Sequence, residues 1–180
     1  GYYHGAMEQL VDSRGYDYII KNANSVCAPI AAEASGSFYH YNCVHGLGHG
    51  FMMVQDGELF KSLKACDSLK DSWERVSCYG GVYMQNIMNA QGPDAAQNQA
   101  PKYLRSDDLV YPCNAVEDKY KERCYQMQTS HMLSAVNYDF RRVFTICDSV
   151  EAGYRNTCYE GVGRDASGST SSDVIRTKNN

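Results

Sequence analysis

Eight cysteines constrain the fold of this 180-residue chain more than any other feature. They form an even set without a Cys-x-x-Cys pair, which argues against zinc ribbons, iron–sulfur clusters and thioredoxin-type redox motifs. The absence of Cys-x-x-Cys-His also excludes covalent c-type haem. Four disulfides are the simplest use of such a set, and disulfides persist in oxidising compartments. We therefore expect an extracytoplasmic protein that is secreted, periplasmic or on the cell surface.

The cysteines belong to a unit that recurs every 34 to 46 residues. Its four copies are centred on Cys43, Cys78, Cys124 and Cys158. In three copies Ser37, Ser72 or Asp118 stands six residues before the cysteine, which predicts a helix N-cap. Glycine follows three residues after the cysteine in three copies, which predicts that a neighbouring helix packs closely there.

Each aligned cysteine has an upstream partner, which we expect to close a second helix. A continuous helix from Cys66 to Cys78 would separate the two sulfurs by about 18 Å, so the chain must turn between them to form a disulfide. The repeat then selects one connectivity: Cys27–Cys43, Cys66–Cys78, Cys113–Cys124 and Cys147–Cys158.

These features predict an all-α fold of stacked helical hairpins, either an α-solenoid-like repeat or a curled bundle. We expect a single domain over residues 1–165. Residues 89–112 are rich in Pro, Asn, Gln and Ala and predict an inserted loop with room for one short helix. Residues 166–180 are polar and predict a flexible tail.

Charge and hydropathy exclude several kinds of partner. The formal charge of −4 is not the basic balance of a nucleic-acid-binding protein. The apolar runs are far shorter than the ~20 residues that cross a bilayer, so we expect no membrane-spanning segment. No signal-peptide pattern opens the sequence, and we expect any such peptide to have been removed. The remaining expectation is another protein, or a second copy, as partner.

The histidines predict a metal site. Residues 1–7 and 46–52 share the pattern G-x-x-H-G-x-M, so we expect the natural chain to begin earlier than residue 1. His45 stands four residues before His49, which places both imidazoles on one helix face, and His4 and Glu8 repeat this spacing. Packed helices lie 8 to 10 Å apart, as a rough guide, so four donors from two helices could converge on one ion. The alternatives are half-buried histidines bonded to carbonyls and a pH-sensing cluster.

Copper, zinc and iron are the candidate ions. Imidazole with a carboxylate favours zinc or iron, whereas the thioethers of Met7, Met52 and Met53 would favour copper as Cu(I). The methionines fall at the spacing of core residues, so packing is an alternative role for them. Met52, His40 and His131 are possible additional ligands, and for the two histidines the alternative is a surface or hydrogen-bonded core position.

Three sequence blocks carry a resemblance to a known group. They are GYYHG at 1–5, CVHGLGHG at 43–50 and CYGGVYMQN at 78–86. They resemble an uncharacterised group of predicted extracytoplasmic bacterial and archaeal proteins, in which GYYHG, CxHGxGHG and GGVxMEN-like blocks occur in this order. The resemblance covers residues 1–88 and implies no known activity, and Gln85 stands where that group has glutamate. In architecture the hairpins also resemble cysteine-rich Sel1-type repeats, which implies partner binding rather than chemistry.

Three function classes remain open. The first is an extracytoplasmic metal-binding helical-repeat protein that binds or presents a metal ion rather than turning over a substrate. The second is a structural or interaction module of a cell-surface or extracellular assembly. The third is a metal-dependent hydrolase or oxidoreductase. We predict no catalytic residue, because the sequence lacks GxSxG, P-loop and HExxH motifs, and we expect Arg164–Asp165 to be a local ion pair.

Overall fold

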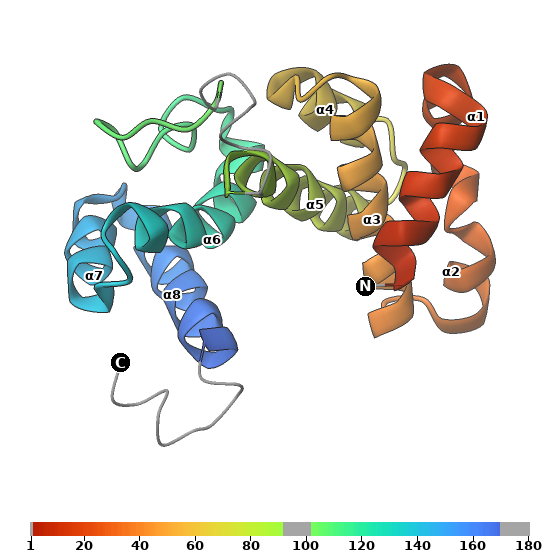
Figure 1. The fold of residues 1–180 in the computed structure, drawn as a ribbon. Helices are drawn as coiled ribbons and strands as arrows, with labels where there is room; N and C mark the ends of the chain where they lie inside the picture. The colour runs from red at the N-terminus through yellow and green to blue at the C-terminus, as the bar shows by residue number, and fades with distance from the viewer. Residues whose placement is uncertain (1, 92–101, 170–180) are drawn as a thin grey trace. The chain divides into compact units, whose positions relative to one another are not determined.

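The computed structural model describes residues 2–91 and 102–169, and for residues 2–4, 8 and 169 it describes the backbone alone. The described residues form α-helices, one short 3-10 helix and no β-strand, which confirms the all-α class. In chain order the elements are α1 (Tyr2–Val26), α2 (Ala28–Ala34), α3 (Phe38–Val54), α4 (Leu59–Cys66), α5 (Ser72–Gln91), α6 (Asp118–Ala135), α7 (Phe140–Ser149), η2 (Ala152–Tyr154) and α8 (Arg155–Ser169) (Figure 1). No helix in the described part is long and apolar enough to cross a membrane.

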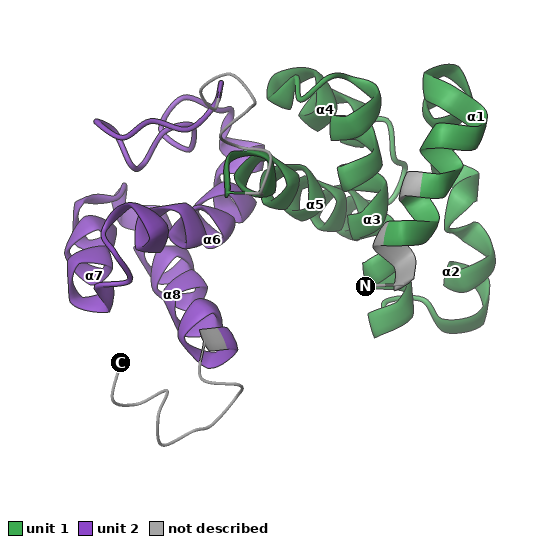
Figure 2. Cartoon of the chain, in the orientation of Figure 1, with its two compact units in different colours: residues 1–94 green, residues 95–180 purple. Residues whose placement is uncertain are grey.

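The chain divides into two compact units, which we call unit 1 (Gly1–Asp94) and unit 2 (Ala95–Asn180) (Figure 2). In unit 1, α3 packs against α1, α4 and α5, and α2 packs beside α3. In unit 2, α8 packs against α6 and α7. The single domain over residues 1–165 stays a prediction.

Unit 2 repeats the last three helices of unit 1 about 80 residues later in the sequence. Helices α3, α4 and α5 correspond to α6, α7 and α8, and their cysteines correspond as Cys43 with Cys124, Cys66 with Cys147 and Cys78 with Cys158. The turns that follow α3 and α6 share a backbone conformation, with two successive residues at positive φ. Asp56 and Gly57 have φ of 52° and 71°, and Asn137 and Tyr138 have φ of 55° and 58°. The structural repeat is therefore about twice as long as the unit found in the sequence.

All four expected disulfides are present, with Cα–Cα distances between 5.4 and 5.9 Å. Cys66 ends α4 and Cys147 lies two residues before the end of α7, as expected for cysteines that close a helix. The same expectation is wrong for Cys113, which lies in a run of turns. Pro112 explains the difference, because a proline disfavours helical backbone at the preceding residue and has no N–H to donate.

The helix caps agree only in part with the sequence patterns. Ser37 caps α3, since its hydroxyl accepts a hydrogen bond at 3.1 Å from the backbone N–H three residues later. Ser72 and Asp118 were wrong as N-caps, because each is the first residue of its helix. Asp71 supplies the side-chain bond at the start of α5, and Glu117 precedes α6 without such a bond. An Asp one position earlier can replace Ser at this place because both side chains accept hydrogen bonds.

Glycines set the close packing of α3 on α5. A Cβ on Gly81 would overlap a backbone carbonyl of α3, and one on Gly48 would overlap a backbone carbonyl of α5. Gly161 plays the same part in unit 2, where its Cβ would stand 2.5 Å from a backbone oxygen of α6. Gly50 faces α1 instead, because its Cβ would lie 3.3 Å from Cγ2 of Val11. Close helix packing thus accounts for Gly48 and Gly50.

Two expected segment boundaries change. Helix α5 continues to Gln91, so residues 89–91 of the expected loop are helical. Residues 102–112 form turns and bends, as expected for a loop, and residues 92–101 lie outside the described residues. Helix α8 continues to Ser169, so a tail from residue 166 was wrong for 166–169, and 170–180 lie outside the described residues. Ala166 in this last part of α8 is buried, although its neighbours in the sequence are polar.

Candidate functional site

His45 and His49 lie one turn apart on α3, and only 3% of each residue is exposed. Their ring centroids are 5.0 Å apart and the ring planes meet at 62°. This geometry confirms that the i, i+4 spacing brings both imidazoles to one helix face. Two nitrogen donors are thereby held close together inside unit 1.

Gln85 of α5 orients the ring of His49. Its Oε1 lies 2.6 Å from Nδ1 of His49, while its Nε2 donates to Oδ1 of Asn89 at 2.6 Å. Because the bond to Asn89 fixes which end of the amide is the donor, Oε1 must accept the hydrogen of His49 Nδ1. The Nε2 atom of His49 then carries the lone pair, which is the form in which an imidazole binds a metal.

Tyr41 plays the corresponding part for His45. Its hydroxyl lies 3.2 Å from Nδ1 of His45, and the two ring centroids are 5.2 Å apart. Tyr41 stands one turn before His45, so an aromatic ladder of Tyr41, His45 and His49 runs along α3. Trp73 of α5 closes the end of this ladder with its ring centroid 6.4 Å from that of Tyr41. In both imidazoles Nδ1 has a side-chain partner, so Nε2 is the nitrogen that a metal would take.

His40 is buried, but its hydrogen bonds differ from those of a metal ligand. The backbone N–H of Gly36 donates to its Nδ1 at 3.1 Å, and its Nε2 lies 2.9 Å from Oε1 of Glu74. Its ring also packs on Trp73 at a centroid distance of 4.9 Å. Both ring nitrogens are used, so the alternative of a hydrogen-bonded core histidine describes His40.

His131 belongs to α6 in unit 2 and carries its own hydrogen bond. Its Nε2 donates to the backbone oxygen of Arg105 at 3.3 Å, and burial lowers the pKa of this imidazole. The bond to a carbonyl is the structural role that the sequence left open for it.

The remaining expected ligands are only partly described. The backbones of His4 and Glu8 belong to α1, and their side chains lie outside the described residues. Met52 is buried with 1% exposed, as expected for a core methionine. Among the described side chains, no group of three or more His, Cys, Asp or Glu residues could hold a metal ion. The described part of the site is thus the imidazole pair with its two hydrogen-bond partners.

Unit 2 carries a different polar cluster at the corresponding helix crossing. Counted from the aligned cysteines, Ser130 matches His49 and Asp165 matches Gln85. Ser130 Oγ donates to Asp165 Oδ1 at 3.0 Å, so the same two positions are bridged in both units. Arg164 pairs with Asp165 at 2.7 Å, which confirms the local ion pair, and also donates to Ser130 at 2.9 Å.

Sequence reasoning did not find the partners of the imidazoles. The sequence patterns mark Gln85 only as a replacement for glutamate, and they do not mark Tyr41. Tyr41 could have been found, because it precedes His45 by one helical turn. Gln85 could not, because its contact with His49 depends on how α5 crosses α3.

Comparisons with protein-family models, with curated proteins and with solved structures find no match to this chain.

Proposed function

We propose that this is an extracytoplasmic protein that binds a transition-metal ion through the imidazoles of His45 and His49. The observation that carries the proposal is the buried pair of rings 5.0 Å apart, each with Nδ1 bonded to a fixed side chain. Metal-binding histidines commonly present one ring nitrogen to the ion while the other is held by a hydrogen bond. Tyr41 and Gln85 supply that second contact here.

Helix α1 supplies the remaining donors in this proposal. Met7 and Val11 are buried, and Val11 packs toward Gly50, the residue after His49. His4 and Glu8 belong to the same stretch of α1, and their role as ligands stays a prediction. With them the site would have three imidazoles and one carboxylate, a donor set that suits zinc or iron. Copper would require a thioether in addition, and Met52 is the candidate.

We propose holding or presenting the ion, not turnover, as the work of this site. Imidazoles that are 3% exposed suit retention of an ion better than exchange of a substrate. The four disulfides support an oxidising compartment, and the recipient of the ion would be another protein or a second copy of the chain.

The test is metal uptake by purified, untagged protein with intact disulfides. After chelator treatment, the protein is dialysed against Zn²⁺, Fe²⁺ or Cu⁺ and the bound metal is measured by mass spectrometry. We expect one equivalent of one of these ions. His45→Ala and His49→Ala should lose it, and Gln85→Leu should weaken binding by about 10- to 100-fold because the ring of His49 is no longer oriented.

His131→Gln is the matched control, because it removes a half-buried histidine from the sister helix α6. It should bind as much metal as the wild type. Near-UV circular dichroism of each variant checks that the fold is kept. Absence of uptake by the wild type, or equal uptake by both alanine variants, would end the proposal.

A structural module is the second candidate, and one observation favours it. The His49–Gln85 bridge has a counterpart in Ser130–Asp165, which joins two crossing helices without any imidazole. The double variant His49→Ser/Gln85→Asp places the unit 2 pair in unit 1. A purely structural role predicts unchanged stability and no metal binding in either protein. The metal-binding role predicts that the graft removes uptake from a protein that otherwise binds.

A further inference from the structure

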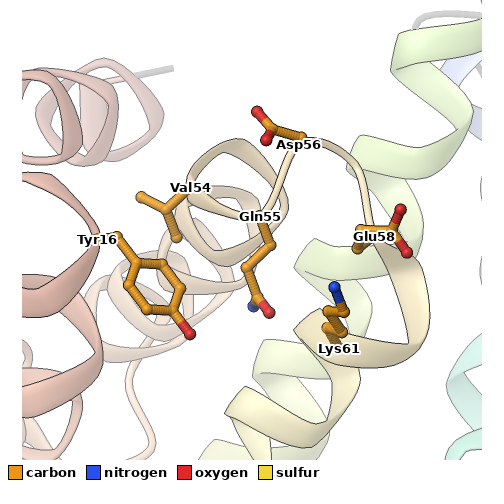
Figure 3. A pocket seen from close by; sticks show the side chains of 6 residues that line it. All are labelled: Tyr16, Val54, Gln55, Asp56, Glu58 and Lys61. Carbon is orange, nitrogen blue, oxygen red and sulfur yellow. The ribbon is translucent and has the colours of Figure 1, made fainter.

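The two ends of α3 lie in different surroundings. The C-terminal end borders a pocket of about 420 Å³, which is lined by Tyr16 of α1 and Lys61 of α4 among others (Figure 3). The carboxylates of Asp56 and Glu58 point away from this pocket, so its polar groups do not converge on one point (Figure 3). The N-terminal end of α3 holds a more specific arrangement, the buried imidazole of His40 with a partner on each ring nitrogen.

The two hydrogen bonds of His40 fit a single protonation state of its ring. Nδ1 accepts from the backbone N–H of Gly36 at 3.1 Å, and an acceptor nitrogen must carry a lone pair. Nε2 lies 2.9 Å from Oε1 of Glu74, and because a carboxylate only accepts, this nitrogen carries the hydrogen. Both bonds therefore exist together only in the neutral imidazole. A proton added at Nδ1 would face the Gly36 N–H and remove that bond.

One charged side chain bonds to this imidazole in the described structure. It is Glu74 of α5, and the ring also packs on Trp73 of the same helix. The next acidic group on this side is Asp71, whose Oδ1 accepts from the backbone N–H of Glu74. From α1, α2 and α4, which also pack on α3, no described side chain bonds to the ring. Protonation would thus leave the contact with Glu74 in place as an ion pair and disturb only the side that faces Gly36.

The bond from Gly36 holds an element that has no buried residue. All residues of α2 are exposed or half-buried, and Gly36 itself is exposed in the turn that follows. The Cys27–Cys43 disulfide attaches the N-terminal end of α2 to α3, and the Gly36–His40 bond attaches the C-terminal end. Segments with few buried contacts open at a low cost in free energy. Loss of the Gly36 bond would therefore release α2, while the disulfide keeps it attached.

Unit 2 has a permanent charge at the corresponding position. Counted from the aligned cysteines, Lys121 of α6 matches His40. Its Nζ pairs with Glu151 at 3.0 Å, just before η2 and α8. A lysine ammonium has no lone pair, and it stays charged over the pH range in which histidine titrates. The charge at this helix position is thus constant in unit 2 and depends on pH in unit 1.

We propose that His40 is a pH-dependent latch for α2. At neutral pH and above, its uncharged ring holds the Gly36 N–H on one side and Glu74 on the other. In acid, the proton taken up at Nδ1 removes the Gly36 bond, the imidazolium stays paired with Glu74, and α2 moves about the Cys27–Cys43 disulfide. The latch is independent of the proposed metal site, because neither His45 nor His49 bonds to His40 in the described structure.

Nuclear magnetic resonance of the purified full chain, with intact disulfides, tests the latch without any variant. Between about pH 8 and about pH 5, the ring protons of His40 and the backbone amide of Gly36 should titrate together. Hydrogen exchange of residues 31–36, corrected for the intrinsic effect of pH, should become about three- to tenfold faster, as expected from the loss of one hydrogen bond. Helix α5 is the internal control and should keep its protection. A Gly36 amide that does not follow His40, or unchanged exchange of residues 31–36, would overturn the proposal.

Two variants remove the titration at this position. His40→Lys copies unit 2 and cannot accept from Gly36, so α2 should exchange at both pH values about as fast as in the acidified wild type. His40→Gln cannot change its charge and should give the same exchange rate at both pH values. His131→Gln, on the sister helix α6, is the matched control and should keep the wild-type response of α2. Near-UV circular dichroism checks the fold of each variant, and a pH response of α2 that persists in both His40 variants would refute the latch.

Discussion

Two polar residues of unit 1, the buried His49 and the half-buried Gln55, stand where unit 2 has Ser130 and Val136. Burial of an imidazole or an amide is unfavourable unless its polar atoms are hydrogen-bonded. For His49 the bond to Gln85 offsets part of this cost, whereas Nε2 of Gln55 has no such bond in the described structure. Because simpler side chains fill the same places in the sister unit, these two positions are candidates for function rather than for folding.

His131 predicts a pH dependence of stability in unit 2. Burial lowers its folded pKa below the ordinary value of 6.5, so the unfolded chain binds the proton more tightly. Stability should therefore fall as the pH drops through 6.5 and level off below the folded pKa. His131→Gln keeps a donor for the Arg105 carbonyl but cannot titrate. Urea unfolding at about pH 7.5 and about pH 5 should show a smaller loss in this variant than in the wild type.

At the scale of the helices, glycine decides how closely neighbours approach. Gly81 and Gly161 occupy the same position after the cysteine in α5 and α8, and both face a carbonyl of the crossing helix. The spacing of hydrophobic residues predicts burial less well at the margin of the apolar face of a helix. Phe140 and Val143 of α7 are buried, but Phe144, one turn after Phe140, is 42% exposed and lies against Tyr159.

Gly81→Ala should lower the free energy of unfolding by about 1–3 kcal/mol, because the added methyl group forces α3 and α5 apart. Gly163→Ala is the control, since that glycine is exposed within α8 and a Cβ there meets nothing within 4 Å. It should raise stability by about 0.5–1 kcal/mol through helix propensity. Urea unfolding measures both, and a Gly81→Ala protein as stable as the wild type would contradict the close crossing.

At the scale of the whole molecule, the two units have one disulfide at corresponding positions of the repeat. The Cys66–Cys78 and Cys147–Cys158 disulfides span 12 and 11 residues, and each joins the second helix of the three-helix repeat to the third. Disulfides stabilise largely by restricting the unfolded chain, and the effect depends on the length of the closed loop. Because the two closed loops are nearly equal in length, the two disulfides should contribute nearly equal amounts to the free energy of unfolding.

Removal of either disulfide, by Cys66→Ser/Cys78→Ser or by Cys147→Ser/Cys158→Ser, should lower the free energy of unfolding of its unit by about 3 kcal/mol. Trp73, the single tryptophan, reports unit 1 by fluorescence, and far-UV circular dichroism follows the helices of both units. The first variant should shift the fluorescence transition. A change of under about 1 kcal/mol in one variant but not in the other would contradict the match between the units.

The sequence by itself determined the helical class, the four disulfide pairs and the shared face of His45 and His49. These features depend on residues less than 20 positions apart, where helical periodicity and the reach of a disulfide leave few alternatives. Cap positions were less certain because neighbouring polar residues can exchange that role.

Only the tertiary structure decided which distant residues meet. Gln85 reaches His49 and Tyr16 lines the same pocket as Lys61 because of how separate helices cross. The tertiary structure also joined the hairpins into a repeat of three helices, α3–α5 and α6–α8, which is about twice as long as the unit found in the sequence. Crossings depend on the fit of whole helix surfaces, including glycine contacts with a backbone far away in the sequence, and no local spacing encodes that fit.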